Sequence, residues 1–452
     1  MRKIFLSLGC VFLIGTASWG QARKIEFTEY NLDNGLHVIL HKDNTTPIVA
    51  VSVLYHVGSK NENPERTGFA HFFEHLLFEG SENIKRGEFD KYITNAGGNN
   101  NANTNNDRTF YYEMLPSNQL ELGLWLESER MMHAKIETAG VETQREVVKE
   151  EKRQRVDNQP YGSFVVEVLK HAYTVHPYRW APIGSMDHLN AATLDEFIDF
   201  YKTFYVPNNA TLSIAGDIDI DNAKTLIAKY FKDIPKGTKP IPRPTVTEPQ
   251  QTKEVRDVVL DNIQLPAVIH AYHMPAQGTP DSYALDMLST LLSGGESSRL
   301  NKALVDDQKT AFQVGSFPFS LEDPGLYIVL SVANMGVNAE TLEKAMDVEI
   351  EKVQKELISE KEFQKVKNQV ESQFVQQNAS MAGIAEQLAN YHVYFGDANL
   401  INTEINRYNK VTREDLQRVA KKYLTKENRV SLFYLPKSAQ SKPDNTQIKQ
   451  QN

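Results

Sequence analysis

The proline-rich segment at residues 233–254, DIPKGTKPIPRPTVTEPQQTKE, most constrains how this chain can fold. It contains five prolines and few apolar residues, so no regular helix or strand can run through it. We therefore expect a partly extended linker. It separates residues 23–232 from residues 255–436, two portions of similar size, and the sequence predicts one domain in each.

A weak internal repeat relates the two portions. The first contains NLDNGLHVIL, VSVLYHVGS and EHLLFEG, and the second contains VVLDNIQLPAVIHAYHMP followed by LDMLSTLLSGG. This similarity predicts a shared scaffold that carries a polar triad only in the first portion. When HLLFEG is aligned with TLLSGG, the residues His71, Glu74 and His75 fall on Asp286, Ser289 and Thr290.

The first 22 residues, MRKIFLSLGCVFLIGTASWGQA, have the pattern of a secretory signal peptide, with cleavage expected after Gly20 or Ala22. The apolar run is shorter than the ~20 residues of a membrane-spanning helix, and no later segment approaches that length. Cys10 raises the alternative of a lipoprotein, but Ser7 stands where such signals prefer leucine. We expect an exported protein without stable membrane insertion, periplasmic in a Gram-negative bacterium.

Cleavage would remove the only cysteine, so we expect no disulfides and no thiolate chemistry. It would also remove Arg2 and Lys3, which leaves 47 basic residues against 58 acidic ones and changes the formal charge from -9 to -11. Such an acidic chain is a poor candidate for binding nucleic acid. The polar tail at residues 437–452 is expected to be disordered.

The stretch GFAHFFEHLLFEG, residues 68–80, places three polar side chains inside an apolar helical pattern. On a helix, His71 and His75 lie one turn apart on the same face and can direct ring nitrogens to one point. Catalytic zinc sites use three such protein ligands and leave a position for water. Glu74, one residue before the second histidine, can reach that water as a general base.

The third ligand is expected in the charged helical segment TQREVVKEEKRQRVDNQP. Glu146, Glu150 and Glu151 are all available there. Periodicity from Val147 and Val148 modestly favours Glu151 for the inward face. A solvated glutamate that only forms salt bridges is the alternative at each of these positions.

Taken together, these motifs resemble those of the pitrilysin-type (M16, inverted-zincin) metallopeptidases. The resemblance covers residues 25–435. Within the family, the chain is similar to the short bacterial members and to subunits of the mitochondrial processing peptidase. It implies an α+β fold of the LuxS/processing-peptidase-like metallohydrolase kind. Two related domains would each have an antiparallel-rich sheet with helices on one side, in agreement with the strands and helices that the sequence suggests.

The same resemblance assigns roles to residues. QREVVKEE matches the family segment with Glu151 in the ligand place, which implies one Zn2+ per chain held with His71 and His75. GGNNNANTNNDRTFYY resembles the segment that leads into an edge strand, where a peptide substrate would add as a further strand. The substrate-binding residues implied are Asn101, Ala102, Thr104, Phe110 and Tyr112.

Three positions depart from the family pattern. Gln144 stands where many members have an acidic residue, so carboxylate support of the site from that position is absent. Active members usually carry an arginine and a tyrosine seven residues apart in the second domain, but LVDDQKTAFQV has Val305 and Phe312 there. Neither side chain can donate a hydrogen bond, and loss of an oxyanion donor typically slows a reaction ~100- to 1000-fold.

These observations predict a zinc-dependent endopeptidase that acts on peptides or unfolded segments. The missing pair predicts that this chain is the zinc-bearing subunit of a heterodimer, with a related partner chain supplying the arginine and the tyrosine. A homodimer is the alternative assembly. A scaffold or peptide-binding subunit that retains a structural metal is the alternative function, and an exported metal-binding protein without a peptide role is a third.

Overall fold

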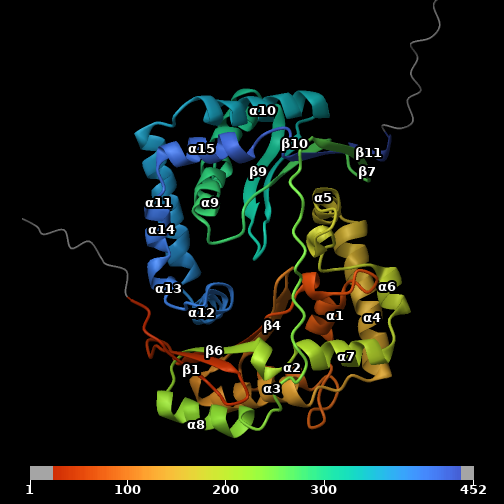
Figure 1. Cartoon of the computed structure of the whole chain (residues 1–452), viewed down its shortest axis with the longest axis vertical. Coiled ribbons are helices and arrows are strands. Elements are labelled where there is room, and N and C mark those ends of the chain that lie inside the picture. The colour runs from red at the N-terminus through yellow and green to blue at the C-terminus, as the bar shows by residue number, and fades with distance from the viewer. Residues whose placement is uncertain (1–23, 439–452) are drawn as a thin grey trace, which may run out of the picture.

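The computed structural model describes residues 24–438 and has an α+β architecture, with its two sheets toward opposite ends of the molecule (Figure 1). The expected fold class is confirmed. The predicted signal peptide and the predicted tail beyond residue 438 lie outside the described residues. Among the helices of the described part, none combines the length and the apolar character that crossing a membrane requires.

The first sheet has six strands in the order β1-β2-β6-β3-β5-β4. Only β2 and β6 pair in parallel, and the other neighbours are antiparallel. The order places β4 at one edge of the sheet. The strands are β1 (Thr28–Asn31), β2 (His37–Lys42), β3 (Ile48–Tyr55), β4 (Asn99–Thr104), β5 (Thr109–Pro116) and β6 (Ala210–Gly216).

The second sheet repeats this arrangement without a counterpart of β1. Its order is β7-β11-β8-β10-β9, again with one parallel pair, β7 and β11. The weak repeat in the sequence therefore corresponds to a shared strand topology, while the exact domain boundaries stay a prediction. The strands are β7 (Val255–Asp261), β8 (Ala267–His273), β9 (Ala311–Phe319), β10 (Leu326–Ala333) and β11 (Arg429–Pro436).

Several helices begin at sequence signals that satisfy their first backbone amides. Thr193 and Glu196 form a capping box, as do Ser359 and Glu362. The helices before the linker are α1 (Phe69–Leu76), α2 (Phe89–Asn95), α3 (Leu120–Met132), α4 (Thr138–Lys152), α5 (Phe164–Ala172), α6 (Met186–Ala191), α7 (Leu194–Phe204) and α8 (Ile220–Phe231). Those after it are α9 (Pro280–Ser293), α10 (Ala339–Lys355), α11 (Glu360–Gln377), α12 (Met381–Phe395), α13 (Leu400–Thr403), α14 (Ile405–Asn409) and α15 (Arg413–Tyr423).

The proline-rich segment has no helix or strand between α8 and β7, and it runs as an extended connection along the molecule (Figure 1). Side chains tie it to the first portion. The Glu248 carboxylate accepts hydrogen bonds from the backbone N–H groups of Thr174, Val175 and His176 at 2.8 to 3.0 Å. The linker is therefore docked along part of its length.

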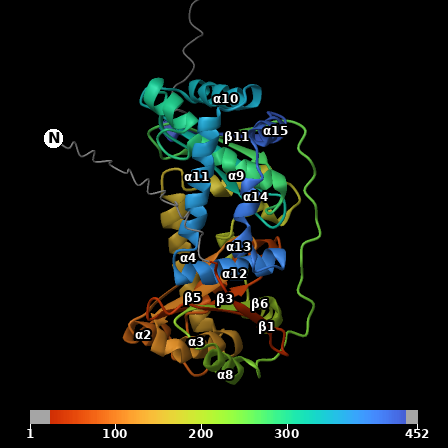
Figure 2. The ribbon, with the colours of Figure 1, turned by 90° about the vertical axis from the view of Figure 1, so that its left-hand side faces the viewer.

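The central strand β3 is buried on both faces because successive side chains alternate between two cores. Val49, Val51 and Val53 belong to the main core of the first portion, whereas Ala50 packs in a separate cluster with Leu388 of α12. Figure 2 shows α12 lying across the first sheet, and its contacts with β3 and β6 agree with that view. A helix from the second portion thus covers the second face of the first sheet.

The first portion likewise supplies a helix that covers the second sheet. Helix α5 belongs to the first portion but packs on β8 and β11 of the second sheet. Its Val168 and Leu169 share a core cluster with Ile269 and Leu432. Each portion therefore supplies one helix that buries apolar surface of the other portion's sheet.

This packing predicts a large cost for truncating α12. Leu388 is fully buried in the cluster beneath the first sheet, and we expect Leu388→Ala to lower the free energy of unfolding by about 2 to 5 kcal/mol. Urea denaturation followed by circular dichroism measures this change. Val375→Ala on α11 is the control, because that side chain is 53% exposed and its loss should cost less than about 0.5 kcal/mol. Equal effects of the two variants would contradict the described packing of α12.

Candidate metal centre and active site

Helix α1 brings two histidines of the HFFEH motif together. The Nε2 atoms of His71 and His75 lie 3.3 Å apart. His71 is buried and His75 is partly exposed. Their spacing of four residues places both rings on one helix face, as the sequence predicts.

Aromatic packing fixes the opposite side of α1. The ring of Phe69 stacks on Phe197 of α7 with centroids 4.5 Å apart, and Phe73 stacks on Phe200 at 5.4 Å. The hydroxyl of Tyr111 on β5 donates to the Phe73 carbonyl at 2.8 Å. Phe69 and Phe73 therefore anchor the helix against α7, and the bond from Tyr111 anchors it against the sheet.

A carboxylate outside the helix caps the start of α1. Gly68 at the N-cap has no side chain and a left-handed backbone with φ of 99°, so it cannot satisfy the first amides itself. The backbone N–H groups of Gly68 and Ala70 donate to Glu62 Oε2 and Oε1, each at 2.9 Å. Burial raises the pKa of Glu62 to about 8. Sequence reasoning missed this residue, and the only available signal was a glycine at a helix start that lacks a capping side chain.

Among the three candidate third ligands, Glu151 of α4 is the one that lies at the histidines. Its Oε2 is 3.1 Å from His75 Nε2 and 3.4 Å from His71 Nε2. The nearby imidazole of His71, and to a smaller extent that of His75, holds the pKa of the Glu151 carboxyl well below its usual range. By contrast, Glu146 pairs with Lys149 and Glu150 with Arg153, and their side chains are 68% and 49% exposed, against 17% for Glu151.

The distances among these three ligand atoms match a tetrahedral metal site. Ligands about 2.0 to 2.1 Å from a tetrahedral zinc lie roughly 3.3 to 3.4 Å from one another, and the observed separations are 3.1, 3.3 and 3.4 Å. The Oε2 atom of Glu151 is buried without a hydrogen-bond partner in the described residues. A cation among these atoms would satisfy that oxygen, so the residues present fit zinc.

Glu74 lies beside the same atoms. One of its carboxylate oxygens and one ring nitrogen each of His71 and His75 lie within 4.8 Å of one another. The side chain is half-buried, which leaves it within reach of water. This position is compatible with a general base for a water molecule held at the three ligands.

A second group of potential ligands, Glu29, His37 and His392, has less suitable geometry. The rings of His37 and His392 stack with centroids 3.4 Å apart and an angle of 2° between their planes. Because imidazole lone pairs lie in the ring plane, two parallel rings cannot both direct them at one ion. The centre on α1 and α4 is therefore the better metal site.

Among the residues predicted to bind substrate, those of β4 and those of β5 are placed differently. Asn101, Ala102 and Thr104 lie on the edge strand β4, which contacts α1. Phe110 and Tyr112 of β5 pack in one cluster with Ala389 and Val393 of α12. These two side chains serve packing in this structure, and their contact with a substrate stays a prediction.

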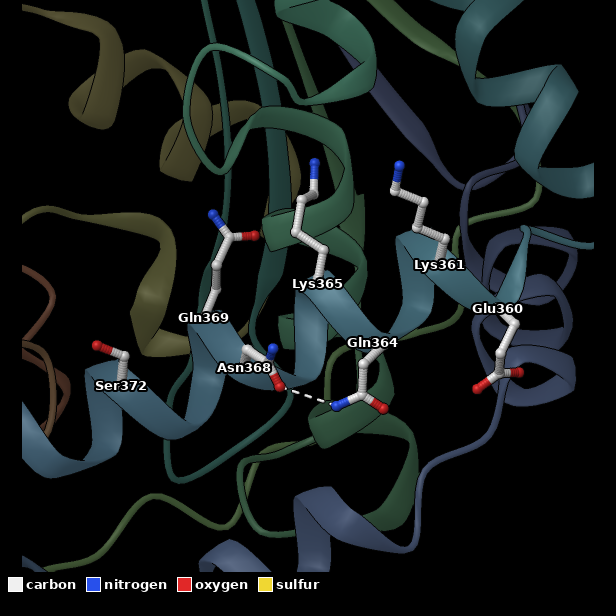
Figure 3. Close-up of a pocket in the computed structure, with 7 residues that line it drawn as sticks. All are labelled: Glu360, Lys361, Gln364, Lys365, Asn368, Gln369 and Ser372. Carbon is white, nitrogen blue, oxygen red and sulfur yellow. Dashed lines mark hydrogen bonds between the residues drawn. The ribbon is translucent and has the colours of Figure 1, made fainter.

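A hollow of about 740 Å³ lies elsewhere, along α11 (Figure 3). The residues that line it come from this one helix, and none of them belongs to the centre on α1 and α4. Lys365 donates to the Ser297 carbonyl, and Gln369 donates to the Gly294 carbonyl. Two of its polar side chains are therefore engaged in bonds to the neighbouring loop.

Comparison with protein families identifies both portions of the chain. The family model described as insulinase, peptidase family M16, matches residues 37–180, and the one described as the peptidase M16 inactive domain matches residues 191–370. The chain is 34% identical over 439 residues to a protein named zinc protease PqqE from Helicobacter pylori, with 96% of this chain and 99% of that protein covered. This chain belongs to the M16 peptidase family.

Solved structures agree with this membership. The crystal structure of a protease from Helicobacter pylori matches this M16 chain with a TM-score of 0.87 and 33% identity, over 91% of this chain and all of that one. The periplasmic protease PqqL from Escherichia coli matches with a TM-score of 0.75 at 20% identity, which shows a shared fold. The match covers 90% of this chain but 47% of PqqL.

The three departures from the M16 pattern are also visible. Gln144 donates to Glu79 and so lies outside the ligand set. Val305 packs against the core of the second portion. Phe312, on the edge strand β9, is 66% exposed, so an apolar ring stands where the family pattern has a hydrogen-bond donor.

The site geometry predicts that zinc retention depends on Glu151 and not on its neighbours Glu146 and Glu150. We expect Glu151→Ala to weaken Zn2+ binding by more than the ~10- to 100-fold typical of losing a partner that only supports a ligand. Metal analysis after dialysis, together with chelator titration, measures the change. Glu150→Ala is the matched control, because that neighbour is paired with Arg153, and it should retain one zinc per chain. Full zinc retention in Glu151→Ala would remove Glu151 from the ligand set.

Proposed function

We propose that this M16 chain is a zinc-dependent endopeptidase acting on peptides or unfolded segments. The observation that carries the proposal is the convergence of His71, His75 and Glu151, with separations of 3.1 to 3.4 Å between their ligand atoms. The zinc protease names of its relatives support the same metal and reaction class. When bound, zinc supplies Lewis acidity, which lowers the pKa of a water toward ~7 and polarises a peptide carbonyl.

The proton transfers fall to Glu74. Its carboxylate would take a proton from the attacking water and later pass it to the leaving amine. The aromatic side chains beneath α1 exclude bulk water from the inner side of this helix. Glu74 would therefore act beside a packed apolar surface that excludes water rather than in open solvent.

The edge strand β4 would hold the substrate. In the described strands β4 pairs only with β5, which leaves its other edge open to an added strand. Main-chain hydrogen bonds along Asn101–Thr104 would bind an extended peptide with little demand on its sequence. The contact of β4 with α1 would bring that peptide near the metal centre.

The assembly that we propose is a heterodimer in which a related chain supplies an arginine and a tyrosine. The observation behind it is that Val305 and Phe312 leave this chain without those donors. PqqL supports pairing of two such units. This chain corresponds in length to about half of PqqL, and it also matches a separate structure of the first half of PqqL. A homodimer is the competing assembly.

A catalytically weak scaffold that binds peptides and retains a structural metal is the second candidate function. The same two residues favour it, because nothing in their place can stabilise an oxyanion. Glu74 argues against it, since a structural metal needs no general base. Activity measurements on Glu74 variants separate the two candidates.

Glu74→Gln tests the general base. We expect peptide hydrolysis to fall ~100-fold or more, because the amide cannot take up the proton, while zinc stays bound through the three ligands. Hydrolysis of a fluorogenic peptide and metal analysis are measured on the same preparation. Undiminished turnover would reject Glu74 as the base. Glu82→Gln is the control, because Glu82 is exposed and paired with His133.

Mixing experiments test the divided site. A related chain that carries the arginine and tyrosine but no HxxEH motif should raise hydrolysis by ~100-fold or more over this chain alone. The assay is run in zinc and in chelator, and gel filtration reports the assembly. Equal activity with and without the partner would contradict the heterodimer, and activity that persists in chelator would contradict the zinc mechanism.

The location that we propose is the periplasm. The predicted signal peptide is the observation behind it, and the match to PqqL, whose structure is described as that of a periplasmic protease, supports it.

A further inference from the structure

Two buried ionisable side chains in the segment Gly58–Glu62, sequence GSKNE, have no role in the proton transfers proposed above. Both Lys60 and Glu62 are largely shielded from water. Burying a charge is costly unless it is paired or hydrogen-bonded. The partners of these two side chains therefore indicate what the segment does.

Glu62 holds the first turn of the helix that carries the metal ligands. Its two carboxylate oxygens accept from the backbone N–H groups of Gly68 and Ala70, each at 2.9 Å. Because Ala70 directly precedes His71, a shift of Glu62 would shift the turn that positions this histidine.

Lys60 connects the same segment to the second portion of the chain. Its Nζ lies 2.9 Å from Asp107 in the first portion and 2.5 Å from Glu322 in the second. Glu322 also lies 2.8 Å from His56 Nε2, and its backbone N–H donates to Asp107 at 2.9 Å. The ammonium group is thus buried in a joint between the two portions.

The backbone between these side chains has little room to move. The N–H groups of Ser59 and Lys60 donate to the carbonyls of Asn105 and Asn106 at 3.2 and 3.0 Å. A Cβ atom added at Gly58 would lie 2.4 Å from the carbonyl carbon of Asn106. The segment is therefore fixed against the turn that joins β4 to β5, and a displacement at Lys60 would be transmitted to Glu62.

We propose that Gly58–Glu62 is a relay between the second portion of the chain and the metal-binding helix. Glu62 is a positioning residue for α1, and the contact of Lys60 with Glu322 sets the position of Glu62. His71 and His75 then keep their ligand geometry only while the second portion is in place. This inference rests on the proposed function in that it takes these histidines as zinc ligands.

A second ion pair between the portions provides a matched control. Arg108, in the turn before β5, pairs with Glu386 of α12. This bridge also joins the first portion to the second, and its two residues make no contact with Glu62 in the hydrogen bonds and ion pairs described. Glu386→Gln weakens the joint without removing a bond of Lys60 or Glu62.

A double-mutant cycle on the full chain tests the relay. Glu62→Gln leaves one acceptor oxygen and turns an NH2 group toward a backbone N–H. Glu322→Gln removes the nearer of the two carboxylate charges that Lys60 meets across the joint, since Asp323 lies at 3.7 Å. The two readouts are the rate of Zn2+ release to a chelator and amide hydrogen exchange in α1. We expect each single variant to accelerate both by ~10-fold, as loss of a partner that supports a ligand does.

The coupling between the variants decides the outcome. In a relay, Glu322→Gln adds less than about 2-fold once Glu62 is replaced, because both act through one path. Glu386→Gln should instead multiply with Glu62→Gln. Independent, multiplicative effects of Glu322→Gln and Glu62→Gln would overturn the relay, and so would equal coupling of Glu386 and Glu62.

Two further measurements keep the test decisive. If Glu62→Gln does not fold, the cycle is repeated with Glu62→Asp, whose side chain is one methylene shorter and draws the carboxylate back from the two amides, and the same coupling is required. If the unmodified chain binds no zinc, the proposed function fails. Hydrogen exchange in α1 still reports the coupling in that case, and its absence would overturn the relay separately.

Discussion

Burial of both faces of the central strands is the constraint on which the rest of this structure depends. A single layer of helices on one side would leave the side chains of β3 that now meet α12 in water. Because α12 and α5 each cover the sheet of the other portion, separating the portions would expose apolar surface on both sheets. The shared burial fixes one relative placement, and the buried charge of Lys60 at the joint is compatible only with that placement.

Within this frame, the proposed metal centre combines side chains from two helices that are stabilised in different ways. Helix α1 is short, with eight residues, and helices of this length are marginal in isolation. Aromatic contacts with α7, the hydrogen bond from Tyr111 and the Glu62 cap stabilise it from three sides. Helix α4 is longer and mostly solvated, and it contributes Glu151 because that residue shares the side turned toward α1.

Local sequence patterns were sufficient for some of these features and not for others. The spacing of His71 and His75 predicts one helix face directly, whereas periodicity favoured Glu151 only modestly, because Glu146 and Glu150 lie on the same charged helix. Glu62 could not be recognised, because its role depends on the backbone of Gly68 and on burial. The packing of α5 and α12 on the sheet of the other portion could not be predicted either, because an amphipathic pattern identifies the apolar face of a helix but not the element that covers it. For Phe110 and Tyr112, the period of two along a strand places both on one face, the face that α12 covers.

In the second portion, the helix that corresponds to α1 carries polar side chains with other partners. Helix α9 follows β8 as α1 follows β3, yet its polar residues are bonded internally: the Asp286 carboxylate accepts from Tyr408 at 2.7 Å, and Ser289 donates to the Asp286 carbonyl at 2.7 Å. With the proposed ligand set in one portion and an exposed Phe312 in the other, two copies of this chain would duplicate the proposed metal site without adding an oxyanion donor. That asymmetry favours a partner of different sequence over a second copy.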